Sequence, residues 1–179
     1  ACVRAATRSA RALRTGLAEA APGLAGPLVR LLADPDPGVR AAASAALCNV
    51  VLDFSPAKAA LLDAGVLPAL ARLAVSPAPA ERLNAAWALQ NLAYHATPGL
   101  RPRLLGELPW GTAASLAADP DDGRVRVRAL NLLQNLFAHA SPADCAATAA
   151  WGGAGLFEEL AWRVREGAAV LAVTTVWPV

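Results

Sequence analysis

The stretch Ala86-Trp87-Ala88-Leu89-Gln90-Asn91-Leu92-Ala93 decides the fold, because related stretches occur before and after it at a nearly fixed spacing. The counterparts are AALCNV at residues 45–50 and NLLQNL at residues 131–136, so an asparagine recurs at offsets of 42 and 44 residues. A period of 20 to 50 residues is typical of stacked repeats, in which each unit packs on its neighbours. The sequence therefore predicts a solenoid.

Glycine and proline divide each period into three helices. Gly65 suits a left-handed helix end, and Ser76-Pro77-Ala78-Pro79 ends the helix that follows. Ser55-Pro56, Thr97-Pro98 and Ser141-Pro142 each place a hydroxyl before proline, which is typical of a helix N-cap. We expect short, medium and long helices at residues 24–33, 38–54, 56–64, 66–75, 80–95, 98–106, 108–118, 122–139, 142–150 and 155–165.

Composition agrees with an all-α fold and limits the classes of partner. The 179 residues include 46 Ala, 28 Leu and no Ile, which favours helices over sheets. The net charge of +2 is too small for the broad field of a nucleic-acid binder. The apolar stretch at residues 168–179 is too short to span a bilayer, so we expect no membrane helix. Three widely spaced cysteines indicate reduced thiols.

A three-helix unit of this length, with Gly65 between its first helices and WALQNLA in its third, resembles the armadillo repeat; HEAT repeats are the second choice. The run CNVVLDFSPAK at residues 48–58 resembles, more closely, armadillo-repeat scaffold subunits of the GID/CTLH E3 ubiquitin ligase. The resemblance implies an all-α, armadillo-type α-solenoid, a right-handed superhelix, over residues 1–163. Residues 164–179 depart from the pattern and are interpreted as a divergent C-terminal tail.

The resemblance also implies a function and a location. It implies a non-catalytic scaffold that docks the substrate receptor of the ligase for ubiquitin-dependent protein degradation. The expected partners are proteins, with no cofactor, no small-molecule substrate, no nucleic acid and no membrane, in the cytoplasm and nucleus. A peptide-binding nuclear-transport adaptor of the importin-alpha class is the alternative, although Trp87 has no tryptophan counterpart in the other two copies.

A polar line runs along each third helix, because residues spaced three or four apart share a face. By resemblance this line borders a concave groove, where asparagines bond a peptide backbone and tryptophan packs its side chains. The candidate partner-binding residues are Asn49, Asp53, Asn84, Trp87, Asn91, His95, Arg128, Asn131, Asn135 and His139. The alternative for each asparagine is a bond to the neighbouring repeat, which would only hold the stack together.

Other polar motifs have structural interpretations. His95 and His139 are repeat copies near helix ends, where capping is favoured over catalysis. The aspartates at residues 34, 36, 119, 121 and 122 suit turns before helices better than a metal loop. Glycines at residues 152–155 indicate a linker, and the arginines at 4, 8, 11 and 14 and at 124, 126 and 128 a solvated face. No catalytic or metal site is predicted.

Overall fold

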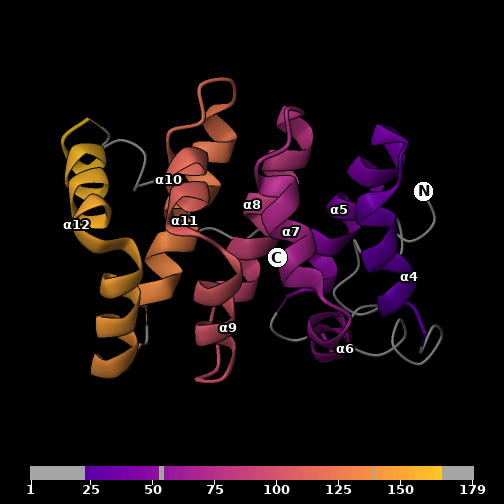
Figure 1. The fold of residues 1–179 in the computed structure, drawn as a ribbon, viewed down its shortest axis with the longest axis horizontal. Coiled ribbons are helices and arrows are strands. Elements are labelled where there is room, and N and C mark those ends of the chain that lie inside the picture. Colours follow the sequence, from indigo (N-terminus) through magenta and orange to yellow (C-terminus); the bar gives the residue numbers. More distant parts are fainter. Residues whose placement is uncertain (1–22, 53–54, 139, 167–179) are drawn as a thin grey trace, which may run out of the picture.

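The computed structural model describes residues 23–52, 55–138 and 140–166, and this part is a row of stacked helices (Figure 1). It contains no strand, and the predicted all-α fold is confirmed. No helix among the described residues is long and apolar enough to cross a membrane. The N-terminal arginine stripe lies outside these residues, as does most of the predicted tail. The proposed boundary at residue 164 therefore stays a prediction.

Each of the first three described units ends in a long helix. The first described unit contains α4 (Ala25–Arg30), the 3-10 helix η1 (Leu31–Ala33) and α5 (Pro37–Val50). The next two units are α6 (Ala57–Asp63), α7 (Val66–Ala74) and α8 (Pro79–Ala93), then α9 (Leu100–Glu107), α10 (Trp110–Ala117) and α11 (Gly123–Phe137). The last helix is α12 (Pro142–Glu166). The predicted short, medium and long order is found in the second unit, whereas α9 and α10 of the third unit are equally long.

Two glycines in the left-handed region join first helices to second helices. Gly65, with φ 84°, lies between α6 and α7. Gly153, with φ 55° and ψ −152°, interrupts α12, which therefore consists of two helices joined at a kink. A side chain at such a positive φ is strained, so glycine suits both junctions. The glycines at residues 152–155 thus include a helix junction, which agrees with the predicted linker.

Only one of the three hydroxyl–proline pairs forms the predicted cap. Ser141 Oγ accepts from the Asp144 N–H at 3.1 Å, while Asp144 Oδ2 accepts from the Ser141 N–H at 3.2 Å, forming a reciprocal capping box. The prediction is wrong for Ser55 and Thr97, because α6 and α9 begin further on, without a side-chain cap. Ser55 is buried instead, and its hydroxyl has no hydrogen-bond partner among the described residues.

The core repeats with the same period as the sequence. Leucines in equivalent positions of the three long helices are at most 1% exposed, and so are the residues three positions further on: Leu47, Leu89 and Leu133, then Val50, Leu92 and Leu136. Burying one such side chain contributes about 2 kcal/mol. Because these residues belong to one continuous apolar cluster, the core runs through the stack without a break between units.

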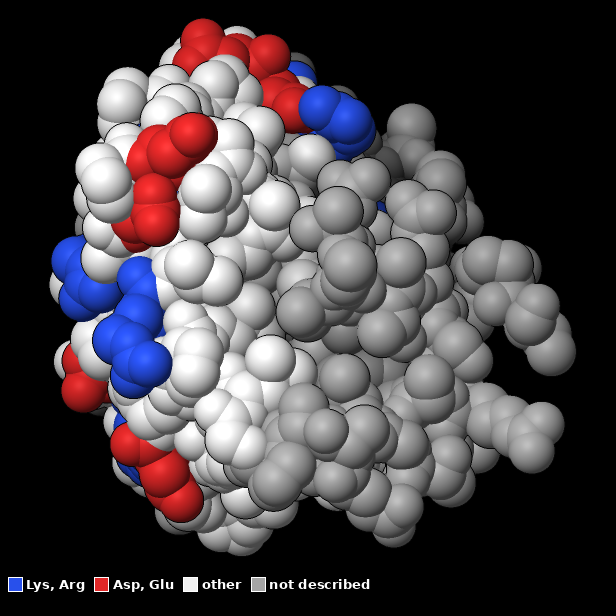
Figure 2. Space-filling model, turned by 90° about the vertical axis from the view of Figure 1, so that its right-hand side faces the viewer, with Lys and Arg blue, Asp and Glu red and all other residues white. Residues whose placement is uncertain are grey.

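The long third helices form one layer. The largest contacts in the described part join α8 to α11 and α5 to α8, and the second helices α7 and α10 pack against α8 and α11. α5, α8 and α11 therefore follow one another along the row (Figure 1). Viewed from the α4–α5 end, acidic and basic side chains of the described part occur in small groups close to one another (Figure 2). This mixture agrees with the low net charge.

Candidate functional site

The predicted partner-binding residues of the described part lie on the layer of third helices or just after it. We call this surface the third-helix face and define it by Asn49 of α5, by Asn84, Trp87 and Asn91 of α8, and by Arg128, Asn131 and Asn135 of α11. His95 follows the end of α8. Asp53 and His139 lie outside the described residues. The face thus brings together residues from three successive repeats.

Three asparagine amides on this face donate to the preceding third helix. Asn91 Nδ2 donates to the Cys48 carbonyl at 2.7 Å, and Asn135 Nδ2 donates to the Gln90 carbonyl at 3.0 Å. These two bonds are equivalent, because each acceptor immediately precedes the asparagine of the earlier repeat. Asn84 Nδ2 donates in the same direction, to the Ala41 carbonyl at 3.3 Å and to Ser44 Oγ at 3.0 Å. The amide groups therefore hold neighbouring repeats together, and their peptide-binding role stays a prediction.

Trp87 and Arg128 form a cation–π pair between α8 and α11. The Arg128 guanidinium carbon lies 4.2 Å from the centroid of the Trp87 ring, a cation–π contact. Arg128 Nη1 also donates to Gln90 Oε1 at 3.3 Å. Both members of the pair are half-buried, and burial lowers the pKa of Arg128. The pair places an aromatic ring and a cation next to each other on the face.

The other predicted residues lie in different surroundings. Asn131, which occupies the position of Trp87 in the next repeat, is 9% exposed. Asn49 is half-buried on α5. His95 is exposed at φ 48°, and its ring stacks on Tyr94 with centroids 4.1 Å apart. Left-handed backbone at this position ends α8, which is shorter than the predicted helix at residues 80–95.

A repeating arginine contact joins the start of each third helix to the turn before it. Sequence reasoning missed this feature. Arg40, Arg82 and Arg126 lie at the same offsets of 42 and 44 residues as the asparagines. Arg40 Nη1 donates to the carbonyls of Asp34 and Pro35, at 2.8 and 3.0 Å. Arg82 Nη1 donates to those of Ser76 and Pro77, and Arg126 Nη1 to that of Asp119. Each arginine thus fixes the turn of its own repeat.

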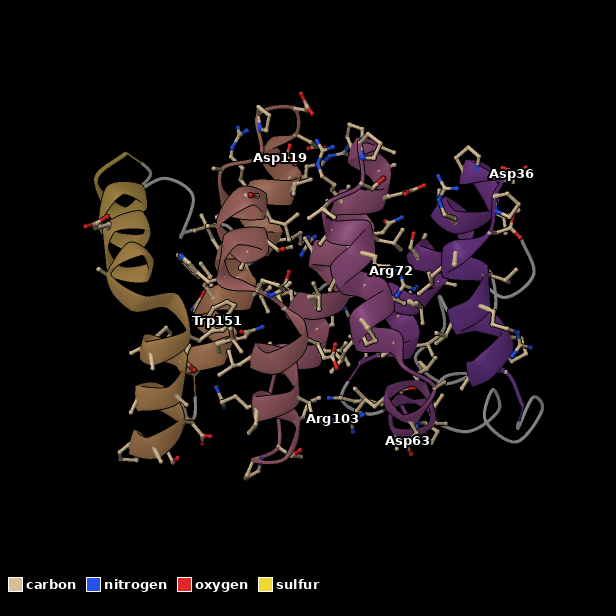
Figure 3. The ribbon with its side chains drawn as sticks, in the orientation of Figure 1. Asp36, Asp63, Arg72, Arg103, Asp119 and Trp151 are labelled. Atoms are coloured by element: carbon tan, nitrogen blue, oxygen red, sulfur yellow. The ribbon has the colours of Figure 1, made fainter. Side chains whose placement is uncertain are left out.

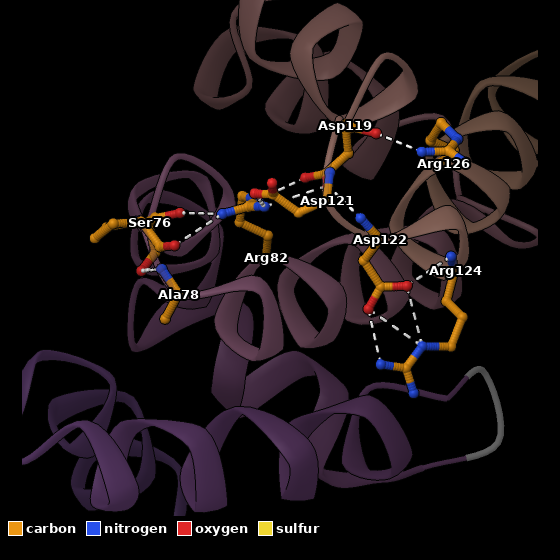
Figure 4. A network of polar contacts seen from close by, with 9 residues as sticks. Ser76, Ala78, Arg82, Asp119, Asp121, Asp122, Arg124 and Arg126 are labelled. Carbon is orange, nitrogen blue, oxygen red and sulfur yellow. Dashed lines mark hydrogen bonds and ion pairs between the residues drawn. The ribbon is translucent and has the colours of Figure 1, made fainter.

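The first two of these arginines also reach the following repeat. Arg40 Nε lies 2.9 Å from Glu81 Oε1. Arg82 Nε lies 2.5 Å from Asp119 Oδ2, and its Nη2 lies 2.7 Å from Asp121 Oδ2 (Figure 4). The hydrogen bond from Arg82 lowers the pKa of Asp119. Figure 3 shows Asp36 and Asp119 at the same edge of the molecule, where the turns before the third helices lie.

The aspartate turns have the predicted structural role. Asp36 Oδ1 accepts from the Gly38 N–H at 2.6 Å and Asp122 Oδ1 from the Arg124 N–H at 2.8 Å, so both are N-caps. Asp119 Oδ1 accepts from the N–H groups of Asp121 and Asp122. No cluster of His, Cys, Asp or Glu among the described residues could hold a metal ion. The predicted solvated face is confirmed for Arg124, which is exposed, and wrong for Arg126 and Arg128, which are half-buried and hydrogen-bonded to neighbouring groups.

The last described unit is held by polar and aromatic contacts as well. Trp151 Nε1 donates to the Leu108 carbonyl at 2.7 Å, and its ring meets Trp110 edge to face, with centroids 5.3 Å apart. Buried Arg101 donates to the Leu136 carbonyl and lies 3.8 Å from Asp144 Oδ1. These contacts extend the solenoid to α12.

Stacked three-helix units with a continuous core define an armadillo-type α-solenoid. The Armadillo/beta-catenin-like repeat matches residues 54–94, and the HEAT repeat matches residues 24–54. A designed armadillo repeat protein in complex with the peptide (KR)4 is 20% identical with a TM-score of 0.77, over 94% of this chain and 69% of that one. A computationally designed armadillo repeat protein for modular peptide recognition is 24% identical with a TM-score of 0.74, over 88% and 64%. These likenesses establish the fold.

The chain is similar in sequence to a particular kind of armadillo protein, and the predicted resemblance is confirmed. The chain is 36% identical to armadillo repeat-containing protein 8 of Danio rerio over 135 residues, and 34% identical to that of Mus musculus. It is 31% identical to GID complex subunit 5 of Schizosaccharomyces pombe over 134 residues. Each match covers 75% of this chain. The chain spans 20% of the length of the Danio rerio and Mus musculus relatives and 17% of the Schizosaccharomyces pombe one.

Proposed function

We propose that this protein-binding armadillo scaffold works without catalysis of its own in a ubiquitin ligase of the GID/CTLH type. Its role there is to dock another subunit, the substrate receptor, for ubiquitin-dependent degradation in the cytoplasm and nucleus. The similarity to armadillo repeat-containing protein 8 and to GID complex subunit 5 supports this assembly. The third-helix face supplies the surface, because Trp87 and the asparagines of three repeats lie on one layer of helices.

The observation that carries the proposal is the set of hydrogen bonds that fix the third helices relative to one another. The bonds from Asn91 to Cys48 and from Asn135 to Gln90 tie each long helix to the one before it. A surface whose parts are fixed before binding loses less conformational entropy when a partner docks. Trp87 adds a large aromatic group in the middle of this surface, and such residues dominate binding energies at interfaces.

The face does not favour the alternative of a carrier for basic nuclear-import peptides. α5 and α11 contain no acidic residue. Glu81, the one carboxylate of α8, is buried and already bonded to Arg40 and Ser76. The designed armadillo protein with a (KR)4 peptide has a basic ligand. A cation such as Arg128 on the third-helix face would repel a peptide of that kind.

The test is co-purification of the tagged chain with recombinant ligase subunits of the LisH/CTLH type and, in parallel, with importin-type carriers. We expect the chain to join the ligase subunits, and Trp87→Ala to weaken that association about thirtyfold, or about 2 kcal/mol. Arg72→Ala, on an exposed position of α7, is the matched control and should bind normally. Association with the carriers alone would overturn the proposal.

A further inference from the structure

The arginines of the third helices differ in whether their charge is satisfied. Arg40 and Arg82 bond carboxylates of the next repeat as well as carbonyls of their own turn. Arg124 pairs with Asp122, and Arg126 donates to a backbone carbonyl. Arg128 has a weaker set of contacts, namely the Trp87 ring and the side-chain oxygen of Gln90. No carboxylate pairs with it in the described part of the chain.

The position of Arg128 makes this difference chemically important. Arg128 is half-buried, and the desolvation that lowers its pKa is a cost that a carboxylate would offset. No carboxylate of the third helices is in a position to do so, because Glu81 is 3% exposed and held by Arg40. A half-buried cation without an anion on a protein-binding surface points to an anionic group in the partner.

The contact between the Arg128 guanidinium and the Trp87 ring bears on which donors Arg128 can offer to a partner. A guanidinium that lies over an aromatic ring uses its flat face for that contact, while its N–H donors point outward in its own plane. Of the five donors, Nη1 reaches Gln90 at 3.3 Å, a long hydrogen bond. The planar group that matches the remaining fork is a carboxylate, which accepts two parallel hydrogen bonds.

We propose that the third-helix face recognises an acidic side chain, Asp or Glu, of an extended partner segment through the Arg128 guanidinium over the Trp87 ring. This inference rests on the proposed function and names the chemistry of the docked segment. The Trp87 ring orients the guanidinium, and Gln90 holds one of its nitrogens. Asn131 and Asn135 follow Arg128 on the same side of α11, at spacings of three and seven residues.

The experiment measures binding of three fluorescein-labelled synthetic peptides to the full chain by fluorescence polarisation. The peptides have eight residues and alternate Ser with Glu, with Gln or with Lys. At about 50 mM salt, where exposed charges are weakly screened, we expect the Glu peptide to bind about tenfold more tightly than the Gln peptide. The Lys peptide should bind more weakly than either. Equal affinity for the Glu and Gln peptides would overturn the inference.

The matched variants are Arg128→Gln and Arg124→Gln, which remove the same charge from the same helix one turn apart. Arg128→Gln should abolish the preference for Glu over Gln, whereas Arg124→Gln should retain it, because Arg124 already pairs with Asp122. Arg128→Lys keeps the charge without the planar fork and should lose part of the preference. If both Gln variants lose it equally, net charge rather than this site is responsible, and the inference fails.

The two proposals fail in different ways. A chain that co-purifies with ligase subunits but shows no preference for the Glu peptide refutes only the acidic-segment inference. A chain that prefers the Glu peptide through Arg128 but binds no ligase subunit refutes the proposed assembly and leaves the site intact. Circular dichroism of each variant checks that the helices remain, and thermal unfolding checks that stability does too.

Discussion

Replacing Arg82 with alanine tests whether the arginine contacts hold the repeats together. Arg82 donates to the Ser76 and Pro77 carbonyls at 3.0 Å each, to both oxygens of Asp119, and to Asp121 at 2.7 Å. Asp119 is only 2% exposed, so the substitution leaves a buried carboxylate without its cation. Breaking a buried ion pair from one side costs about 3–5 kcal/mol.

Asp119 keeps two backbone donors after the substitution, the N–H groups of Asp121 and Asp122. These contacts reduce the expected loss of unfolding free energy to about 2–4 kcal/mol. The measurement is urea denaturation followed by circular dichroism, where the midpoint should fall while the dependence on urea stays constant. Arg124→Ala is the control, since that side chain is 75% exposed and solvent screens its pair with Asp122.

The same pair predicts a pH dependence. The hydrogen bond from Arg82 lowers the pKa of Asp119, so the pair contributes stability above the unfolded carboxyl pKa of about 3.9 and loses it as pH falls through the lower folded value. The difference between the wild-type chain and Arg82→Ala should be constant from about pH 5 to 8 and shrink below about pH 4. A difference below about 0.5 kcal/mol at neutral pH, indistinguishable from Arg124→Ala, would refute the reasoning.

Three further predictions concern the stack, a helix junction and a thiol. Asn91→Ala should lower the unfolding free energy by about 1–3 kcal/mol, because it leaves the Cys48 carbonyl unpaired. Unchanged stability with weakened binding would make Asn91 a binding residue instead. Gly65→Ala should lower the unfolding free energy by about 1 kcal/mol, because alanine is strained at a φ of 84°. The new Cβ adds no clash, since its nearest neighbour is Pro68 Cγ at 3.9 Å, and an unchanged urea midpoint would contradict the prediction. Burial raises the pKa of the Cys48 thiol to about 12, so a thiol reagent at about pH 8 should modify this residue only after the chain unfolds. Peptide mapping by mass spectrometry would detect the modification, and rapid labelling of Cys48 in the native chain would contradict the prediction.

Part of the candidate site could be predicted from the sequence, and part could not. The period of Asn49, Asn91 and Asn135 placed these residues correctly on successive third helices. It did not indicate where each amide points, since a peptide and a neighbouring helix both offer backbone carbonyls. The arginine contacts were missed for a related reason: their acceptors are mostly carbonyls, which no sequence pattern marks. The recurrence of Arg40, Arg82 and Arg126 at the repeat offsets was the available signal.

The sequence alone determined the helices, their order and the core, because these depend on interactions that are local or that repeat with the period. Leu89 is buried for the same reason as Leu47 and Leu133, and Gly65 ends a helix through its own backbone freedom. Tertiary structure decided which residues of different repeats meet. Arg128 lies over Trp87, 41 positions earlier, only because of the offset and rotation between α8 and α11. Side-chain packing between repeats fixes that geometry, and a repeat period by itself does not specify it.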